Sequence, residues 1–330
     1  MRPMENYLEN TRRFASQLDP KALTGSRLAK LGGGKIDRVI VAGMGGSGLT
    51  GDLAEHFRDE IGIPVPVVAW KNYGVPKTRA KHPFFIFVSF SGRPAETVSG
   101  LKEALRMKPR PLIAVVTAKG SPGELRQIAM RESLPLVTFP GGGLTPREAI
   151  GYAWGAVSKL LHAQFPKVRE QKPIRGLNLG MEERRARALA KRIRGTVPLV
   201  YTDHPFAAVG YVWKICLNET GKSPAFQAVL TELNHNEIAG FETKLARFTA
   251  LFLDHPGTRP EVREASGRTA KALAHAGVKV VRVPLLGSTF TERTWRGIVL
   301  AHFTSYFLAL SNKKDPVQTK VIDYLKSLAH

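Results

Sequence analysis

The sequence predicts an α/β protein made of two tandem, doubly wound parallel sheets. Short apolar runs of strand length alternate with amphipathic stretches of helical length along all 330 residues. This alternation is typical of parallel sheets that are covered by helices on both faces. The length is sufficient for two domains of ordinary size. We therefore expect two flavodoxin-like αβα sandwiches in succession.

In the first half of the chain, apolar runs mark the expected strands, and the stretches between most of them have helical periodicity. Strands are predicted at 38–42, 65–69, 84–89, 111–116 and 134–139. Amphipathic stretches of helical length occur at 49–59, 95–107 and 122–131. Each of these helices would connect two parallel strands, as a doubly wound sheet requires.

The second half repeats this organisation. Strands are predicted at 197–201, 247–254 and 278–284, each followed by a helical segment. The stretch 165–180 has no strong period and contains two prolines, so we expect the linker there. The predicted domains are therefore residues 1–165 and 166–330.

The net charge indicates which partners suit the chain, and the cysteine content excludes some kinds of disulfide and metal site. The chain has 49 Lys and Arg against 27 Asp and Glu, a net charge of +22. This balance suits an anionic partner such as a phosphorylated metabolite, although a solvated basic surface would give the same count. No nucleic-acid-binding motif is found, so we expect no nucleic-acid partner. The single cysteine, Cys216, excludes a disulfide framework and any zinc site built from several thiolates.

Neither the N-terminal segment nor the most apolar stretch of the sequence indicates a membrane protein. The N-terminal segment carries charges every few residues and lacks the apolar core of a secretory signal. The most apolar helical stretch, 297–311, is too short to span a bilayer. We therefore expect a cytoplasmic location and no membrane partner.

A glycine-rich loop follows the first predicted strand and precedes a helix. In the segment GMGGSG, Gly43, Gly45 and Gly48 satisfy the pattern G-x-G-x-x-G, and such a loop brings backbone N–H groups close to an anion. A nicotinamide enzyme would also need a carboxylate at the end of the next strand. The residues there, 69–72, include none. A 2′-phosphate bound by Lys71 keeps an NADP site open as the weaker alternative.

A second polar loop follows the strand at 84–89. Ser89 and Ser91 lie two residues apart on an extended backbone and so share one face. Because ligands of doubly wound sheets bind beyond the carboxyl ends of the strands, Ser47 is expected at the same edge. Each serine alone could be a helix cap or a turn residue. Together they predict a cradle for a phosphate monoester.

These segments resemble a known family. GMGGSG (43–48) and SFSGRPAET (89–97) look like the sugar isomerase (SIS) fold, and more closely they are similar to the bifunctional phosphoglucose/phosphomannose isomerases of archaea and bacteria. The similarity continues in the same order along nearly the whole chain, in VVAWKNYGVP (67–76), PREAIGY (146–152), LNETGKSPAF (217–226), ELNHNEIAGFE (232–242) and DPVQTKVIDYLK (315–326).

The resemblance implies an activity. A protein of this family would interconvert glucose 6-phosphate, and mannose 6-phosphate, with fructose 6-phosphate by proton transfer through a cis-enediol. It would need no cofactor and no metal, and it would form a homodimer with shared active sites. It would bind the substrate phosphate through residues that we call the phosphate cradle: Gly45, Gly46, Ser47, Ser89 and Ser91.

The resemblance also implies catalytic roles. Glu219 corresponds to the base that moves the proton between C1 and C2, and Arg147 to the arginine that stabilises the enediolate. His235 corresponds to the ring-opening histidine, which the neighbouring subunit contributes. Thr319 and Lys326 correspond to the C-terminal residues that approach the sugar. Without the resemblance, Glu219 would be interpreted as an ordinary carboxylate at the end of a helix.

One departure from the family pattern leaves alternatives open. Where the family has S-x-S-G-N-T, this chain has Arg93 and Pro94 after Ser91-Gly92, so the threonine hydroxyl is absent. The alternatives are an SIS isomerase for a different sugar phosphate, and a regulator that binds a sugar phosphate without catalysis. The combination of Glu219, His235 and Lys326 argues against the regulator, because binding alone needs no base.

Overall fold

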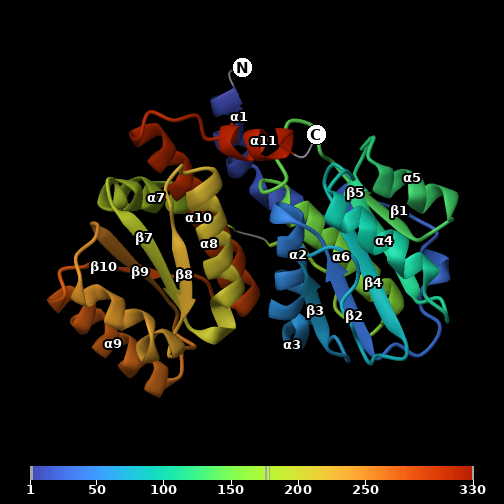
Figure 1. Cartoon of the computed structure of the whole chain (residues 1–330), viewed down its shortest axis with the longest axis horizontal. Helices are drawn as coiled ribbons and strands as arrows, with labels where there is room; N and C mark the ends of the chain where they lie inside the picture. The colour runs from blue at the N-terminus through green and yellow to red at the C-terminus, as the bar shows by residue number, and fades with distance from the viewer. Residues whose placement is uncertain (1–2, 175–176, 178, 329–330) are drawn as a thin grey trace. The chain divides into compact units, whose positions relative to one another are not determined.

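The computed structural model describes residues 3–174, 177 and 179–328, which form two compact units (Figure 1). The N-terminal unit comprises residues 13–175, and the C-terminal unit comprises residues 1–12 together with 176–330. The division lies within the expected linker, of which residues 175, 176 and 178 are outside the described residues. The units differ from the predicted domains 1–165 and 166–330 at both ends of the N-terminal unit.

Side-chain contacts explain both differences. Helix α1 (Pro3–Arg12) belongs to the C-terminal unit because Tyr7 is buried there, with its hydroxyl 2.7 Å from Nδ1 of His302. Arg12 also pairs with Glu183 at 2.9 Å. The segment after residue 165 stays with the N-terminal unit because Gln171 accepts a hydrogen bond from the Trp154 indole at 3.1 Å. Polar contacts of this kind join residues that are mostly far apart in the sequence, so no sequence pattern could reveal them.

The N-terminal sheet has the order β1-β6-β5-β4-β2-β3. Neighbouring strands are parallel except for β1, which pairs antiparallel with β6 at the edge. The strand bounds are β1 (Thr24–Ser26), β2 (Arg38–Ala42), β3 (Val67–Trp70), β4 (Pro83–Ser89), β5 (Leu112–Ala118) and β6 (Leu136–Phe139). The parallel strands follow the flavodoxin-like order, which reverses between β2 and β4. All the predicted strands are present, whereas β1 was not predicted because it has only three residues and no apolar pattern.

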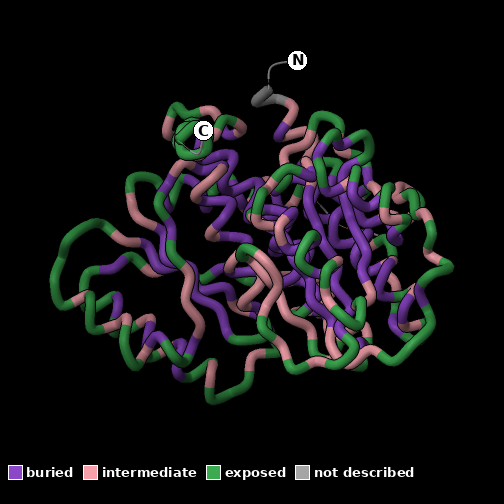
Figure 2. Tube along the Cα trace, turned by 45° about the vertical axis from the view of Figure 1, so that its right-hand side comes forward, coloured by how far each residue is buried: buried purple, intermediate pink, exposed green. Residues whose placement is uncertain are grey.

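Helices cover both faces of this sheet. On one face α2 (Gly45–His56) and α6 (Ile150–Gln164) contact each other, and on the other α4 (Ala95–Arg106) contacts α5 (Glu124–Arg131). Every residue of β4 is buried, as expected for a central strand with helices on both sides. Figure 2 shows that the buried residues, in purple, run through the interior of the chain, while the exposed ones lie on its outside. The predicted helix 49–59 in fact begins at Gly45 and ends at His56, and the short helix α3 (Arg58–Ile61) follows it.

The C-terminal sheet is parallel throughout, with the order β10-β9-β7-β8. Its strands are β7 (Val197–Thr202), β8 (Phe226–Val229), β9 (Phe248–Asp254) and β10 (Lys279–Pro284). β8 was not predicted, because its four residues follow a glycine and a proline and are only partly buried. The order of this sheet reverses between β7 and β9, as that of the N-terminal sheet does between β2 and β4.

The remaining helices belong mainly to the C-terminal unit. Helices α7 and α8 pack against α10, while α9 contacts β9 and β10. The bounds are α7 (Leu179–Ile193), α8 (Ala207–Glu219), α9 (Pro260–His275), α10 (Phe290–Ser311) and α11 (Lys320–Ser327). Short 3-10 helices are η1 (Phe14–Leu18), η2 (Pro20–Ala22), η3 (Leu28–Lys30), η4 (His204–Phe206), η5 (Glu232–His235) and η6 (Glu237–Glu242). Among the described helices, none combines the length and the apolar character needed to cross a membrane.

Candidate functional site

In the N-terminal unit, the loops after β2 and β4 meet where the strand order reverses. Ser47, in the first turn of α2, is buried, and its Oγ accepts a hydrogen bond from the backbone N–H of Phe90 at 3.0 Å. This bond ties the glycine-rich loop to the loop that carries Ser89 and Ser91. The structure therefore brings these three predicted serines into one local group.

The second loop is shaped by its own hydroxyl groups. Oγ of Ser89 accepts from the N–H of Gly92 at 2.9 Å, and Oγ of Ser91 accepts from the N–H of Arg93 at 3.4 Å. Gly92 has a φ of +68°, a left-handed conformation that favours glycine. Because each serine oxygen already accepts a backbone N–H, its own O–H remains able to donate to an anion.

Gly46 and Arg147 are neighbours in this unit. Gly46 is buried, and a Cβ atom placed there would lie 2.6 Å from the backbone nitrogen of Arg147. The side chain of Arg147 is itself buried, with 4% of the residue exposed. Gly45, by contrast, is exposed and has a φ of +52°. The first turn of α2 thus needs glycine at both positions for different reasons, namely close approach and a left-handed backbone.

We expect Gly46→Ala to destabilise the N-terminal unit by about 1–3 kcal/mol, because the new methyl group meets backbone atoms that cannot rotate away. Thermal unfolding of the two proteins measures this difference. Gly142→Ala is the matched control, since a Cβ atom there meets nothing within 4 Å. Equal melting temperatures for Gly46→Ala and Gly142→Ala would show that the 146–147 backbone does not pack on α2.

Lys71, the residue that kept an NADP site open, already has a partner. Its Nζ lies 2.6 Å from each carboxylate oxygen of Asp52 in α2. Burial raises the pKa of Asp52, and the ammonium group of Lys71 opposes that rise. The ion pair fixes Lys71 against the helix, and this arrangement disfavours its use as a ligand for a 2′-phosphate.

In the C-terminal unit, Glu219 is the last residue of α8, as the sequence predicted. It is half-buried and lines a pocket of about 660 Å³, to which Thr319 also contributes. The preceding residues Trp213 and Cys216 are buried and anchor this part of the helix in the core. Packing of α8 therefore presents one carboxylate to the pocket from a rigid element.

The pocket beside Glu219 is rich in cations. Its lysines are Lys222, Lys313, Lys314 and Lys320. Lys222 Nζ donates hydrogen bonds to the backbone oxygens of Glu219 and Gln318, which ties the end of α8 to the segment before α11. Sequence reasoning assigned no role to Lys222, although it lies within the segment LNETGKSPAF, because a bridge over so long a sequence separation leaves no local pattern. The arrangement suits an anionic substrate that is attacked by a base.

The two predicted residues of the C-terminal helix have different environments. Thr319 is the residue directly before α11, is half-buried, and its Oγ1 donates to Oδ1 of Asp323 at 3.4 Å. Lys326 lies near the end of α11 and is exposed. Among the described residues, the structure thus places Thr319 but not Lys326 in the wall of the Glu219 pocket.

His235 ends η5 with an exposed side chain. Its loop is held firmly, because Leu233 is buried and Asn234 Oδ1 accepts a hydrogen bond from Thr269 at 2.7 Å. His235 is not among the residues lining the Glu219 pocket of its own chain. No cluster of three or more His, Cys, Asp or Glu residues that could hold a metal ion is found in the described part of the chain.

Comparison with known proteins points to sugar-phosphate enzymes. Residues 182–328 match the family model for the bacterial phospho-glucose isomerase C-terminal SIS domain. The bifunctional phosphoglucose/phosphomannose isomerase of Aquifex aeolicus is 29% identical over 290 residues, which cover 87% of this chain and 89% of that protein. The protein of the same name from Thermoplasma acidophilum is 27% identical over 89% of this chain and 90% of its own length.

Two further proteins that act on other sugar phosphates are also similar to this chain, one in sequence and one in structure. The D-glucosamine-6-phosphate 4-epimerase of Sulfolobus acidocaldarius is 28% identical over 71% of this chain and 72% of its own. The crystal structure of glucosamine-6-phosphate deaminase from Thermotoga maritima superposes with a TM-score of 0.70 over 96% of both chains, at 13% identity. These matches and the parallel sheets described above confirm the predicted fold of two tandem doubly wound α/β domains, of which the second matches an SIS domain.

Proposed function

Because the chain is a homologue of the bifunctional phosphoglucose/phosphomannose isomerases, we propose that it interconverts glucose 6-phosphate and mannose 6-phosphate with fructose 6-phosphate. The observation that carries this proposal is the position of Glu219, a rigidly held carboxylate in a lysine-lined pocket. Aldose–ketose isomerisation needs one such group to move a proton between adjacent carbons. It needs no cofactor.

In this proposal, the phosphate cradle holds the substrate phosphate. The hydroxyl groups of Ser47 and Ser89 accept from the protein backbone and donate to phosphate oxygens. The N–H groups at the start of α2, where Gly45 and Gly46 lie, add the favourable end of the helix dipole. Ser91 completes the group as a third donor.

The proposed chemistry proceeds through a cis-enediol. Glu219 removes the proton from C2 of the aldose and returns it to C1, and the reverse reaction uses the same group. Arg147 stabilises the charge that develops on the enediolate oxygens. His235 transfers a proton during opening of the pyranose ring, while Thr319 and Lys326 contact the sugar.

We further propose that the protein acts in the cytoplasm as a homodimer in which His235 serves the site of the partner subunit. Support comes from the exposed side chain of His235 on an anchored loop and from its place outside the Glu219 pocket of the same chain. A homodimer of this kind has two equivalent composite sites.

An activity assay with three substrates tests the function. Purified protein is given glucose 6-phosphate, mannose 6-phosphate and glucosamine 6-phosphate in turn, and the products are identified by NMR. Formation of fructose 6-phosphate from the first two supports the proposal. A C4 epimer of glucosamine 6-phosphate would favour the reaction of the Sulfolobus relative, and tight binding without turnover would indicate a regulator.

We expect Pro94→Thr to lower KM for the hexose phosphate severalfold with little change in kcat, which is the signature of added uniform binding. Pro94 is the N-cap of α4, a position at which threonine is favourable, so the fold should be preserved. Michaelis–Menten kinetics on the assay above measure the change. Pro64→Thr is the control, because Pro64 is an exposed loop residue. A raised KM for Pro94→Thr would mean that Arg93 and Pro94 form a different working loop.

A further inference from the structure

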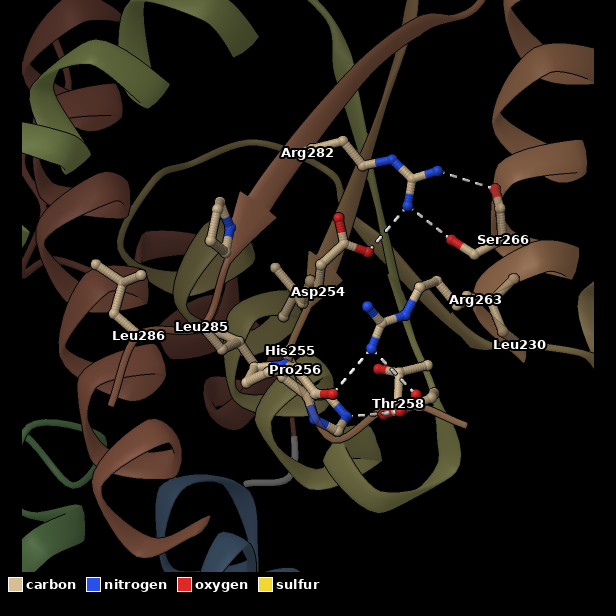
Figure 3. Close-up of a pocket in the computed structure, with 13 residues that line it drawn as sticks. Leu230, Asp254, His255, Pro256, Thr258, Arg263, Ser266, Arg282, Leu285 and Leu286 are labelled. Carbon is tan, nitrogen blue, oxygen red and sulfur yellow. Dashed lines mark hydrogen bonds and ion pairs between the residues drawn. The ribbon is translucent and has the colours of Figure 1, made fainter. Parts of the chain in front are cut away.

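A second pocket lies at the carboxyl ends of the strands of the C-terminal sheet (Figure 3). It has a volume of about 390 Å³, and residues that follow β7 and β9 or end β10 line it. The strand order reverses between β7 and β9, and open α/β sheets bind ligands at such a reversal. The pocket shares no lining residue with the Glu219 pocket. It is therefore a separate candidate site, and the case for it does not depend on the isomerase assignment.

The floor of this pocket holds a buried carboxylate whose second oxygen is unpaired. Asp203 follows β7 and is 5% exposed, and its Oδ2 lies 2.6 Å from Nε2 of His255, which is 9% exposed. Oδ1 of Asp203 is buried and has no hydrogen-bond partner among the described residues. A buried acceptor that lacks a hydrogen-bond donor destabilises the folded state. Because Oδ1 has almost no exposed surface, a ligand hydroxyl supplies the missing donor once the carboxylate turns towards the pocket, whereas an anionic group would be repelled there.

The mouth of the pocket carries guanidinium groups that are fixed in position. Arg282 donates to Oδ1 of Asp254 at 2.9 Å and to Oγ of Ser266 at 2.7 Å, and Arg263 donates to the backbone oxygens of Pro256 and Thr258. Two guanidinium groups thus face one carboxylate at the mouth (Figure 3). Arg282 is paired with a carboxylate, whereas Arg263 donates to uncharged backbone oxygens, so the charge of Arg263 is the one available to an anion. Because Arg263 is already oriented, little side-chain entropy is lost when it binds an anion.

Most of the remaining wall is apolar. Leu230, Leu253 and Leu285 line the pocket and are largely buried. Small-molecule sites commonly combine apolar walls with a few oriented polar groups, and this volume is within their usual range. The C–H surface of a sugar could pack on these leucines while its hydroxyl groups face the floor.

We propose that this pocket binds a small polyhydroxylated anion, of the class of sugar phosphates and sugar acids. A hydroxyl group donates to Asp203, and the anionic group lies at the mouth against Arg263. In the phosphate cradle, the glycines and the serine after β2 face the anionic group of the ligand. In this pocket, the loop after β7 has the carboxylate of Asp203, so a hydroxyl group of the ligand faces that loop instead. The C-terminal unit would thereby have its own ligand site.

Hydrogen–deuterium exchange with sorbitol 6-phosphate tests the proposal, because this probe has no carbonyl group and cannot be isomerised. We expect slower exchange in the peptide 254–263, which saturates with probe concentration. Sorbitol and inorganic phosphate are the comparison probes, each with one of the two required features, and both should bind at least about tenfold more weakly. Protection of the peptide 43–48 reports the phosphate cradle separately, so failure of either site is recognised independently.

Two variants assign the binding to named groups. Asp203→Asn and Arg263→Gln should each weaken the probe's protection of 254–263 by about tenfold or more, while protection of 43–48 is unchanged. Arg259→Gln is the control, because Arg259 is exposed and pairs only loosely with Glu261 at 3.7 Å. If Asp203→Asn fails to fold, the result for Arg263→Gln alone tests whether the pocket binds the probe. Wild-type protection confined to 43–48, equal binding of inorganic phosphate, or an unchanged response in Arg263→Gln would each overturn the proposal.

Discussion

Replacing Glu219 with glutamine is expected to lower kcat for the isomerisation of fructose 6-phosphate by about 10²–10⁴-fold or more. Glutamine has nearly the shape of glutamate but cannot accept and return a proton at the carbon acid. The residue is half-buried at the end of α8, and the packed segment before it, which includes Trp213, is left intact. Binding of the substrate should persist, because the proposed phosphate-binding groups lie on other elements.

Two measurements separate lost chemistry from lost structure. Turnover is followed by the activity assay, and binding at the phosphate cradle by the protection of the peptide 43–48 from hydrogen–deuterium exchange in the presence of sorbitol 6-phosphate. Glu132→Gln is the matched control, because Glu132 also ends a helix, as the C-cap of α5, and lies outside both pockets. Near-normal turnover in Glu219→Gln would assign the base to another residue.

The central strands could be predicted because burial on both sides gives them a continuous apolar run. This holds for β4, in which every residue is buried, and for β9, whose interior residues are all buried. The strands that escaped prediction are the edge strands β1 and β8, which have three and four residues and little buried surface. Their positions are decided by pairing with β6 and β7, which is information that the local sequence does not contain.

The residues of the candidate site also divide into those that the sequence could predict and those that depend on tertiary contacts. Ser47 and Ser89 could be placed together because the first follows one strand and the second ends another at the same edge of a parallel sheet, and topology determines that edge. Lys222 could not be assigned a role, because its bridge from α8 to the segment before α11 depends on how two distant loops fold. Asp203 and His255 were missed for a related reason, since each looks like an ordinary loop residue until β7 and β9 become neighbours.

Replacing His235 is expected to cause the second large loss of activity. Its proposed role depends on the assembly of two subunits. Its loop is anchored by Leu233 and by the bond from Thr269 to Asn234, so the exposed imidazole is presented from a fixed position. If it serves the partner's site, each site takes Glu219 from one chain and His235 from the other. His235→Ala alone should then lose most of its activity on the cyclic sugar, as Glu219→Gln does.

Mixing these two nearly inactive variants is expected to restore activity to about a quarter of wild type. After free exchange of subunits, about half of the dimers contain one copy of each variant. In such a dimer, one site carries both substitutions and the other carries neither, so half of its sites work. If a single chain supplied both residues, every site in the mixed dimer would lack one group. Native mass spectrometry establishes that mixed dimers have formed, and absence of recovered activity in them would refute the shared site and assign Glu219 and His235 to one subunit.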